Sequence, residues 1–366
     1  MSMSMDERSS YHDDFNSTDV GLNASDFRAR MFEQCRIPWG KLQNNINMSN
    51  DQALVRIREG ASILLLNFPN EREVGFDMMA WVAGPIFKGF KMIPPGLHFL
   101  YWDGGHGMME GIWYKAVKGR VLVRQWDKEL EDFAPGCGMD EESRLRFEEG
   151  VRKFDFDRGL APSSDDDGWR DMTAFVDEHV LVSAGLSFDR HGMTEHLIPG
   201  DPDEESKRDD RSRELVAHFP GPARTVLFTQ LDRVQLSLGQ SKTRLLNVDW
   251  ATLVIEEILL QSHSGNQSRL LGEFQLSYIT FLLLNSLSAF EFWKEMVFHF
   301  SSSQDLILRR PGLFHNFLTS LRIQLSHAPK DFFTDEMTSD NFLKAPRGGA
   351  ECCQDSTSEH ATVSYG

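Results

Sequence analysis

Cysteine is scarce in this sequence, and it contains neither an apolar signal region nor a long uninterrupted apolar segment. The four cysteines, Cys35, Cys137, Cys352 and Cys353, have neither the spacing of a disulfide framework nor that of a zinc site, so we expect reduced thiols. The N-terminus is polar and acidic, and the longest apolar segment, residues 276–290, is interrupted by serine, threonine and asparagine. These absences predict an intracellular, soluble protein with no membrane partner.

Basic residues are also few relative to acidic ones. The chain has 38 lysines and arginines against 55 aspartates and glutamates, which gives a formal net charge of −17. Residues 131–214 alone contain 24 acidic and 11 basic residues, so most of the excess is central. Such a chain repels nucleic acid, and Lys88 and Lys91 are interpreted as solvated strand residues, with phosphate contact as the alternative. We therefore expect a protein partner with a basic surface and no direct nucleic-acid partner.

The motifs of catalysis are missing as well. No Gly-x-Ser-x-Gly elbow is present, and Cys137, which lies between two glycines, has no evident base partner. Gly105-His106-Gly107 looks like the start of a dinucleotide-binding loop, but Glu110 occupies the position of its last glycine, so a turn is the better interpretation. The sequence predicts no enzymatic activity and no cofactor.

Two sets of polar residues could in principle bind metal ions. His191, Glu195 and His196 lack the helical spacing of a zinc protease, which favours an ordinary loop. Asp165–Asp167 suit the start of a helix, where the backbone N–H groups favour negative charge, with a cation site as the alternative. We predict no metal site.

Length and composition predict more than one domain. With 366 residues, of which 40% are hydrophobic, the chain exceeds what a single core usually holds. We expect an α+β multidomain protein, in which a β-rich, sandwich-like N-terminal domain precedes an α-helical bundle C-terminal domain. The expected segments are a mostly disordered tail (1–50), the β-rich domain (51–160), a connecting helix (161–184), an acidic and largely irregular loop (185–245), the helical domain (246–343) and a disordered tail (344–366).

Short apolar and aromatic runs separated by turn residues predict the β-rich domain. Residues 63–66, 73–76 and 97–102 have the character of strands. The turn Pro94-Pro95-Gly96 has the composition of a type II turn, in which glycine supplies the positive φ. Together these segments predict a β-meander.

Further elements follow along the chain. Residues 111–117 and 120–126 are two strand candidates separated by Lys118-Gly119, which predicts a hairpin. Residues 168–182 predict one helix, and Thr225–Thr229 form an ordered island that adds an edge strand or docks on a neighbour.

Helical periodicity dominates after Asp249. Residues 270–284 are apolar almost all round, which is typical of the central helix of a bundle. A break at Asn285-Ser286 separates them from a second helical stripe at residues 287–297, so an αα-hairpin is predicted. Pro311 suits the first turn of a further helix.

The identities of the residues in the predicted meander are more informative than its pattern of strands and turns. The N-terminal group of specific residues is Gly75-Phe76-Asp77, Trp81, Gly84-Pro85, Phe87-Lys88-Gly89, Lys91-Met92-Ile93-Pro94-Pro95-Gly96 and His98-Phe99. The C-terminal group is Leu271–Gln275, Phe281–Asn285, Ala289–Lys294 with Trp293, Asp331-Phe332-Phe333 and Asp340–Leu343. In both groups the chain resembles the A1-alpha2-repression (AAR-two) splicing-factor family. We call these residues the signature residues.

The resemblance implies an assembly factor of the U5 small nuclear ribonucleoprotein in pre-mRNA splicing. Such a factor would bind the RNase H-like and MPN-type domains of pre-mRNA-processing factor 8 and delay the joining of the helicase. It would occur in both cytoplasm and nucleus. The tail at residues 344–366 departs from the family, because it is polar where an apolar continuation is expected. A helical adaptor that binds peptides of a different complex is the alternative.

The resemblance leaves the roles of individual residues open. Trp81 and the Pro94-Pro95-Gly96 turn have a structural interpretation, as core and turn, and a partner-binding one. Phosphorylation between the domains is thought to release the partner in the family. Ser206 and Ser212, beside the basic residues at positions 207, 208, 211 and 213, are the candidate phosphorylation sites, because a phosphate there could pair with those side chains.

Overall fold

The computed structural model describes residues 49–105, 108–134, 138–163, 167–199, 224–240 and 248–328. All of them belong to one compact unit, Ala24–Ala328. The predicted C-terminal tail, nearly all of the predicted N-terminal tail, and Cys137 lie outside the described residues. Among the helices that the structure describes, none is both long and apolar enough to cross a membrane.

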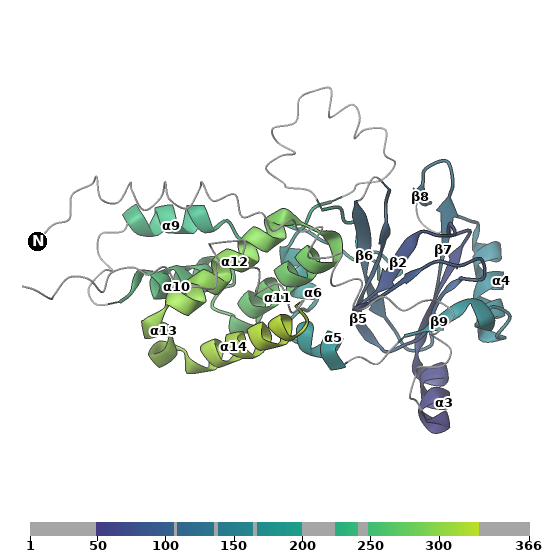
Figure 1. Cartoon of the computed structure of the whole chain (residues 1–366), viewed down its shortest axis with the longest axis horizontal. Helices are drawn as coiled ribbons and strands as arrows, with labels where there is room; N and C mark the ends of the chain where they lie inside the picture. The colour runs from purple at the N-terminus through teal and green to yellow at the C-terminus, as the bar shows by residue number, and fades with distance from the viewer. Residues whose placement is uncertain are drawn as a thin grey trace, which may run out of the picture. The chain divides into compact units, whose positions relative to one another are not determined.

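Two β-sheets form the N-terminal region (Figure 1). One sheet has five strands in the order β8-β7-β1-β4-β9, and the other has four in the order β3-β2-β5-β6. Side chains of both sheets, such as Phe90 and Trp102, share one hydrophobic core, as expected of a sandwich-like domain. The strands are β1 (Ala61–Leu66), β2 (Glu73–Phe76), β3 (Met79–Val82), β4 (Gly89–Ile93), β5 (Gly96–Asp103), β6 (Met109–Ala116), β7 (Val121–Asp127), β8 (Asp132–Phe133) and β9 (Leu160–Pro162).

The predicted strands are present, but two predicted pairings are wrong. β6 and β7 do not form a hairpin, because β6 pairs with β5 while β7 pairs in parallel with β1. The meander is divided as well, since β4 and β5 on either side of the proline turn belong to different sheets. Consecutive residues of β1 and β7, including Ile63–Leu65 and Val121–Val123, are buried, and a strand buried on both faces requires cover on both sides.

Helix α4 (Glu141–Arg152) provides that cover on the outer face of the five-stranded sheet. Its Val151 packs with Leu64, Val121 and Val123 in a second, smaller apolar cluster. Asp140 caps the helix by accepting a hydrogen bond from the backbone N–H of Ser143 at 2.7 Å. Helix α3 (Asn50–Glu59) precedes β1, and the 3₁₀ helix η2 (Asp157–Gly159) precedes β9.

The single helix predicted over residues 168–182 is instead two short helices, α5 (Asp167–Met172) and α6 (Glu178–Ser183). The chain between them approaches helix α11, where the backbone N–H of Phe175 donates to Oε1 of Gln275 at 2.8 Å. Asp177 then starts α6 by accepting from the backbone N–H of Val180. A continuous helix would not allow this backbone contact.

Helices form the C-terminal region, as the sequence predicts from residue 246 onward. Helix α9 is a correction, because residues 231–240 lie in the segment 185–245 that the sequence predicts to be largely irregular. Every residue from Leu270 to Leu284 in α11 is buried, and Asn285 ends that helix with a φ of 60°. Ser286 caps the next helix, so the predicted αα-hairpin is present. The helices are α9 (Leu231–Gln240), α10 (Trp250–Gln261), α11 (Gln267–Leu284), α12 (Leu287–Ser302), α13 (Gln304–Arg309) and α14 (Pro311–Ser326).

The β-rich and helical regions pack directly on each other. Trp169 in α5 donates from Nε1 to the carbonyl oxygen of Leu97 at 3.0 Å, and its ring lies 5.9 Å from that of Trp113 in β6. In Figure 1, α5 and α6 lie between β5 and β6 on one side and α11 on the other. The connection between the regions is therefore part of the folded structure.

Candidate functional site

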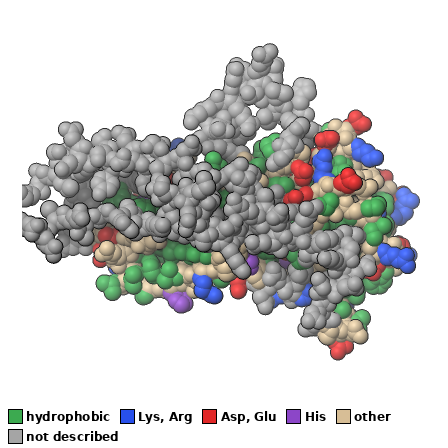
Figure 2. Space-filling view, in the orientation of Figure 1, with side chains coloured by type: hydrophobic (Ala, Val, Ile, Leu, Met, Phe, Trp, Pro, Cys, Tyr) green, Lys and Arg blue, Asp and Glu red, His purple; other side chains and the backbone are tan. Residues whose placement is uncertain are grey.

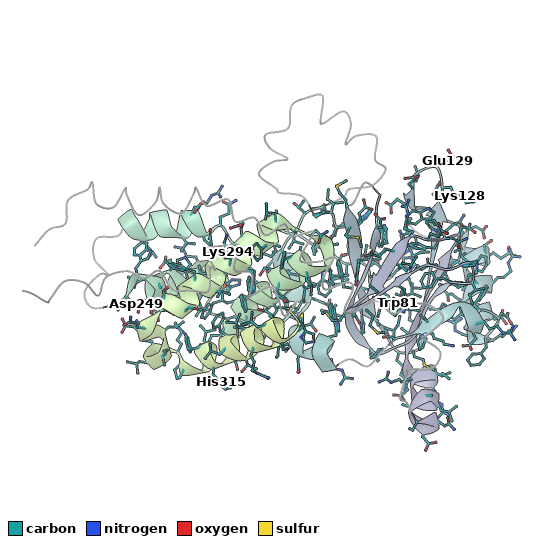
Figure 3. The ribbon with its side chains drawn as sticks, viewed as in Figure 1. Trp81, Lys128, Glu129, Asp249, Lys294 and His315 are labelled. Atoms are coloured by element: carbon teal, nitrogen blue, oxygen red, sulfur yellow. The ribbon has the colours of Figure 1, made fainter. Side chains whose placement is uncertain are left out.

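Most N-terminal signature residues form the scaffold. Trp81, labelled in Figure 3, is fully buried and packs on Phe90 with 5.2 Å between ring centroids. Gly75 makes room for Tyr101, because a Cβ at position 75 would lie 1.9 Å from its ring. Gly89 has a φ of 124°, and a Cβ there would approach the backbone of β1. These positions have a structural role in the sheets.

His98 holds the proline turn at the start of β5. Its Nε2 lies 2.8 Å from the carbonyl oxygen of Pro94, and its Nδ1 lies 2.7 Å from Oδ2 of Asp77. Asp77 also accepts the backbone N–H of Phe99 at 2.9 Å. Gly96 has a φ of 148°, which agrees with the positive φ predicted for the turn. Because both partners of His98 are acceptors, the ring fits best as an imidazolium that donates at both nitrogens.

The charge of Asp77 governs the protonation of His98. Burial by itself lowers the pKa of His98, and so does Arg170, but the charge and hydrogen bond of Asp77 and the carbonyl of Pro94 raise it above its ordinary value overall. Both ring nitrogens are occupied. The cluster is therefore a structural clamp and offers no free nitrogen to a substrate or metal ion.

The signature lysines are engaged within the sheet. Lys91 forms an ion pair with Asp157 of η2. The backbone of Lys88 donates to Gly159 and accepts from Leu65, both at 2.7 Å. For Lys91, which lies in β4, the ion pair favours the interpretation as a strand residue over phosphate contact, whereas Lys88 lies just before β4 and the role of its side chain stays a prediction.

The other signature residues lie in a turn, in the helices or outside the described residues. Gly84, with Pro85 next to it, begins a turn in which its carbonyl oxygen accepts from the N–H of Phe87 at 3.0 Å. Trp293 in α12 is buried and donates from Nε1 to Oε1 of Gln324 at 2.9 Å. The candidate residues Ser206 and Ser212 and the signature residues Asp331-Phe332-Phe333 and Asp340–Leu343 fall outside the described part of the chain.

Part of the loop predicted to be irregular is instead built onto the edge of the four-stranded sheet. Leu197 and Gly111 of β6 exchange backbone hydrogen bonds at 2.8 and 3.1 Å. The N–H of Ile198 then donates to the carbonyl oxygen of Arg224 at 3.0 Å. The described residues on either side of positions 200–223 are therefore joined at one place on the sheet edge. This junction is the candidate functional site, and we call residues 186–199 and 224–230 the loop anchor.

His196 in the loop anchor lies between two carboxylates. Its Nε2 is 3.0 Å from Oε2 of Glu110 in β6, and its Nδ1 is 3.1 Å from Oδ2 of Asp132 in β8. The ring also packs against Trp102, with 5.0 Å between centroids. Burial by itself lowers the pKa of His196, but the hydrogen bonds and charges of Asp132 and Glu110 raise it to about 9. At neutral pH the charged ring thus links the loop anchor to both sheets.

The same three side chains have the composition of a metal site. One ligand atom from each of Glu110, Asp132 and His196 lies within 4.8 Å of the others. A metal ion requires a neutral imidazole, however, and the raised pKa of His196 means that a proton competes strongly. We therefore interpret the cluster as an ion-pair clamp. The sequence predicts only an ordinary loop at His196, because no spacing motif connects these three residues from distant segments.

A second polar contact fixes the other side of the loop anchor. Glu195 accepts from the backbone N–H and the hydroxyl of Ser187 at 2.8 and 2.7 Å, and lies 3.5 Å from Nε of Arg224. Burial raises the pKa of Glu195, but the Ser187 hydrogen bonds and Arg224 lower it below its ordinary value overall. The ionised carboxylate therefore joins the outgoing and the returning chain.

The returning chain continues onto the helical region. Phe228 stacks on Phe292 of α12 with 5.0 Å between centroids. Thr229 donates its N–H and hydroxyl to Glu273 of α11 at 2.6 and 3.0 Å, and Glu273 also pairs with His263. The predicted island therefore docks on its neighbour, so the loop anchor connects the edge of the sheet with the helices.

Comparison with known proteins identifies related chains. Residues 59–184 match the AAR2 N-terminal domain and residues 228–347 match the AAR2 C-terminal repeat region. A "Protein AAR2 homolog" from Caenorhabditis elegans is 28% identical over 311 residues, covering 78% of this chain and 84% of the relative. Proteins with the same name from Mus musculus and Homo sapiens are each 25% identical, over 82% and 78% of this chain and 84% and 80% of their own length. The two matched regions leave residues 185–227, with most of the loop anchor, between them.

Proposed function

Because the chain belongs to the AAR2 family, we propose that it is an assembly factor of the U5 small nuclear ribonucleoprotein that binds pre-mRNA-processing factor 8 and delays the joining of the helicase. The observation that carries this proposal is the match of both regions of the chain, in order, to the two parts of the family. The proposal includes a binding role without catalysis, and a place in both nucleus and cytoplasm.

The arrangement of the two regions supports a binding role. Most N-terminal signature residues, such as Trp81, are buried within the sheets, whereas Pro85 and Pro95 are exposed, so a partner can be held by these prolines together with other exposed residues. The β-rich region and the helical region are fixed to each other through Trp169 and through the loop anchor. A large partner can therefore be held by two surfaces whose relation is already set, which lowers the entropic cost of binding.

Release of the partner is proposed to depend on residues 200–223. Their two ends are joined at the Ile198–Arg224 hydrogen bond, next to His196 and Glu195. Phosphate on Ser206 or Ser212 would pair with the neighbouring basic residues and change the course of the chain between these ends.

Affinity purification of the tagged full chain from cells tests the function. We expect pre-mRNA-processing factor 8 and other U5 proteins to be recovered without the helicase. Recovery of a different complex without any U5 protein would favour the helical adaptor and contradict the proposal. For the release step, the double variant S206E/S212E should bind the purified scaffold protein more weakly than S206A/S212A does. Equal affinities would remove the phosphorylation part alone.

A further inference from the structure

Helix α9 is attached to the helical bundle by a narrow apolar contact. Its buried side chains, among those that the structure describes, are Leu231, Val234 and Leu238. Their spacing of i, i+3 and i+7 places them on one face of the helix, which packs on α10 at the outer edge of the helical region (Figure 1). With ten residues, α9 is shorter than helices that are stable alone in water, so it depends on this contact.

The contact is incomplete at the C-terminal end of α9. A pocket of about 400 Å³ opens beside Leu238 and is lined on the α10 side by Leu253, Leu259 and Leu260. Side chains that line a pocket lack contacting atoms on one side, so they gain less from packing. Leu238 therefore holds α9 less firmly than a fully packed leucine would.

An unpaired carboxylate lies near the other end of α9. Glu295 of α12 is half-buried, and among the described residues it has no partner in a hydrogen bond or ion pair. The charged groups that act on it are Asp232 in the first turn of α9, Glu291 and Lys294. Lys294, labelled in Figure 3, pairs with Glu291 at 2.6 Å and lies over the ring of Phe290. The single lysine is therefore already engaged by another carboxylate.

Acidic residues of the helices packed against α12 have partners of their own. Glu256 of α10 binds Arg309 at 3.1 and 3.2 Å, and Glu273 of α11 pairs with His263 at 3.0 Å. Figure 2 shows few acidic side chains on the visible part of the helical region, whereas more of them lie on the β-rich region. Glu295 differs from these residues, because its charge is not balanced by a partner.

The protonation of Glu295 sets the cost of keeping α9 in place. Burial, Asp232 and Glu291 raise the pKa of Glu295 to about 7, against a smaller opposing effect of Lys294. Well below that pH the carboxyl is neutral, and its burial next to α9 costs little. Above it, an ionised carboxylate is held half-buried beside Asp232, which is unfavourable. The attachment of α9 therefore weakens as the pH rises toward the pKa of Glu295.

We propose that α9 is a pH-sensitive strap, docked on α10 while Glu295 is neutral and detached while Glu295 is ionised. Detachment moves the charge of Asp232 away and gives the carboxylate of Glu295 access to water. The chain just before α9 stays in place, because Thr229 is bound to Glu273 of α11 by two hydrogen bonds. The strap is a local device at the end of the loop anchor, and it does not depend on the proposed role in splicing.

Hydrogen exchange of the full-length chain at about pH 5 and pH 8 tests the strap. Protection factors, which correct for the intrinsic effect of pH on exchange, should fall about 10–100-fold for residues 234–240, because the docking equilibrium changes by up to about tenfold per pH unit. Protection of α11 and of the Thr229 amide should change less than about threefold. Unchanged protection of residues 234–240 would overturn the proposal. A parallel loss in α11 would overturn it too, because the opening would then be global.

Substitutions test whether Glu295 controls the strap. In E295Q the fall in protection should shrink to less than about threefold, and D232N should reduce it in part, because one like charge is removed. E129Q, at an exposed glutamate of the β7–β8 turn, is the control and should keep the full fall. If E295Q keeps the full fall, the proposal is wrong.

A further variant tests whether α9 can detach by itself. V234D should remove the protection of α9 at both pH values while α11 remains protected, because a charge on the buried face of α9 prevents docking. Loss of protection in α11 as well would contradict a separately detachable helix.

Discussion

Asp77 and His98 join two neighbouring segments of the four-stranded sheet through a buried ion pair. Oδ2 of Asp77 lies 2.7 Å from Nδ1 of His98, and Oδ1 accepts the backbone N–H of the next residue, Phe99. Asp77 has a φ of 55°, so it follows β2 in a turn whose position this carboxylate fixes. The same histidine also contacts the carbonyl oxygen of Pro94 in the proline turn. If His98 loses its charge, it can donate a hydrogen bond to only one of these two turns.

Removing the charge of Asp77 should destabilise the sheet. We expect D77N to lower the free energy of unfolding by about 1–3 kcal/mol at pH 6 and to lower the pKa of His98. The raised pKa of His98 means that its contribution is complete below about pH 6.5 and is lost as pH rises through the folded-state pKa. Urea unfolding and NMR titration of the His98 ring would measure both effects. D157N, which breaks the exposed pair with Lys91, should cost less than about 1 kcal/mol.

His196 should make the stability of the chain dependent on alkaline pH. Because its pKa is raised to about 9, the stabilisation is complete below about pH 6.5 and is lost between that pH and 9. We expect the free energy of unfolding to fall by about 2–3 kcal/mol over this range, and the fall to be largely absent in H196Q. Chemical unfolding at several pH values measures it. H315Q, at an exposed histidine of α14, should leave the profile unchanged, and an unchanged profile in H196Q would contradict the ion-pair clamp.

Two helical glycines should respond in opposite ways to alanine. A Cβ at Gly272 in α11 would lie 2.3 Å from the carbonyl oxygen of Phe175, whereas at Gly312 in α14 nothing lies within 4 Å. G272A should therefore cost about 2–3 kcal/mol, while G312A should be neutral or stabilise by about 0.5–1 kcal/mol. Thermal and urea unfolding would measure the pair. If G272A is harmless, the backbone of Phe175 does not approach α11 as described.

Glu295 in α12 should destabilise the helical region once it ionises. Burial, Asp232 of α9 and Glu291 raise its pKa to about 7, against a smaller opposing effect of Lys294. Because the pKa of this carboxyl is higher in the folded state than in the unfolded state, the fold becomes less stable as the pH rises from about 4.5 to 7. E295Q should therefore raise the free energy of unfolding by about 1–2 kcal/mol at pH 8 and change it little at pH 4.5. Melting temperatures at the two pH values would measure this difference. E129Q, on the exposed β7–β8 turn marked in Figure 3, should show no such gain.

The strands and helices could be predicted from local sequence because their residues carry the information. Ile63–Leu65 and Val121–Val123 are continuous apolar runs, and Asn285-Ser286 has the composition of a helix end followed by a cap. Pairing could not be predicted from the same residues. The Lys118-Gly119 turn is compatible with a hairpin and equally with a connection between two sheets. The second arrangement is the one that buries both faces of β7, and this burial depends on residues elsewhere in the chain.

The candidate site shows the same limit. The sequence predicts only an ordinary loop at His196, because its partners Glu110 and Asp132 come from two different sheets. Likewise, the helix predicted over residues 168–182 is broken because Phe175 meets Gln275, about 100 residues further on. Contacts of this kind depend on tertiary structure, which a local pattern does not contain.

The hydrogen bond between Ile198 and Arg224 makes the fold insensitive to the length of the chain between them. The entropy of closing a chain segment grows only with the logarithm of its length, so we expect doubling the number of residues between Ile198 and Arg224 to cost about 0.6 kcal/mol. An engineered reporter domain inserted between these two residues should therefore leave both flanking regions intact.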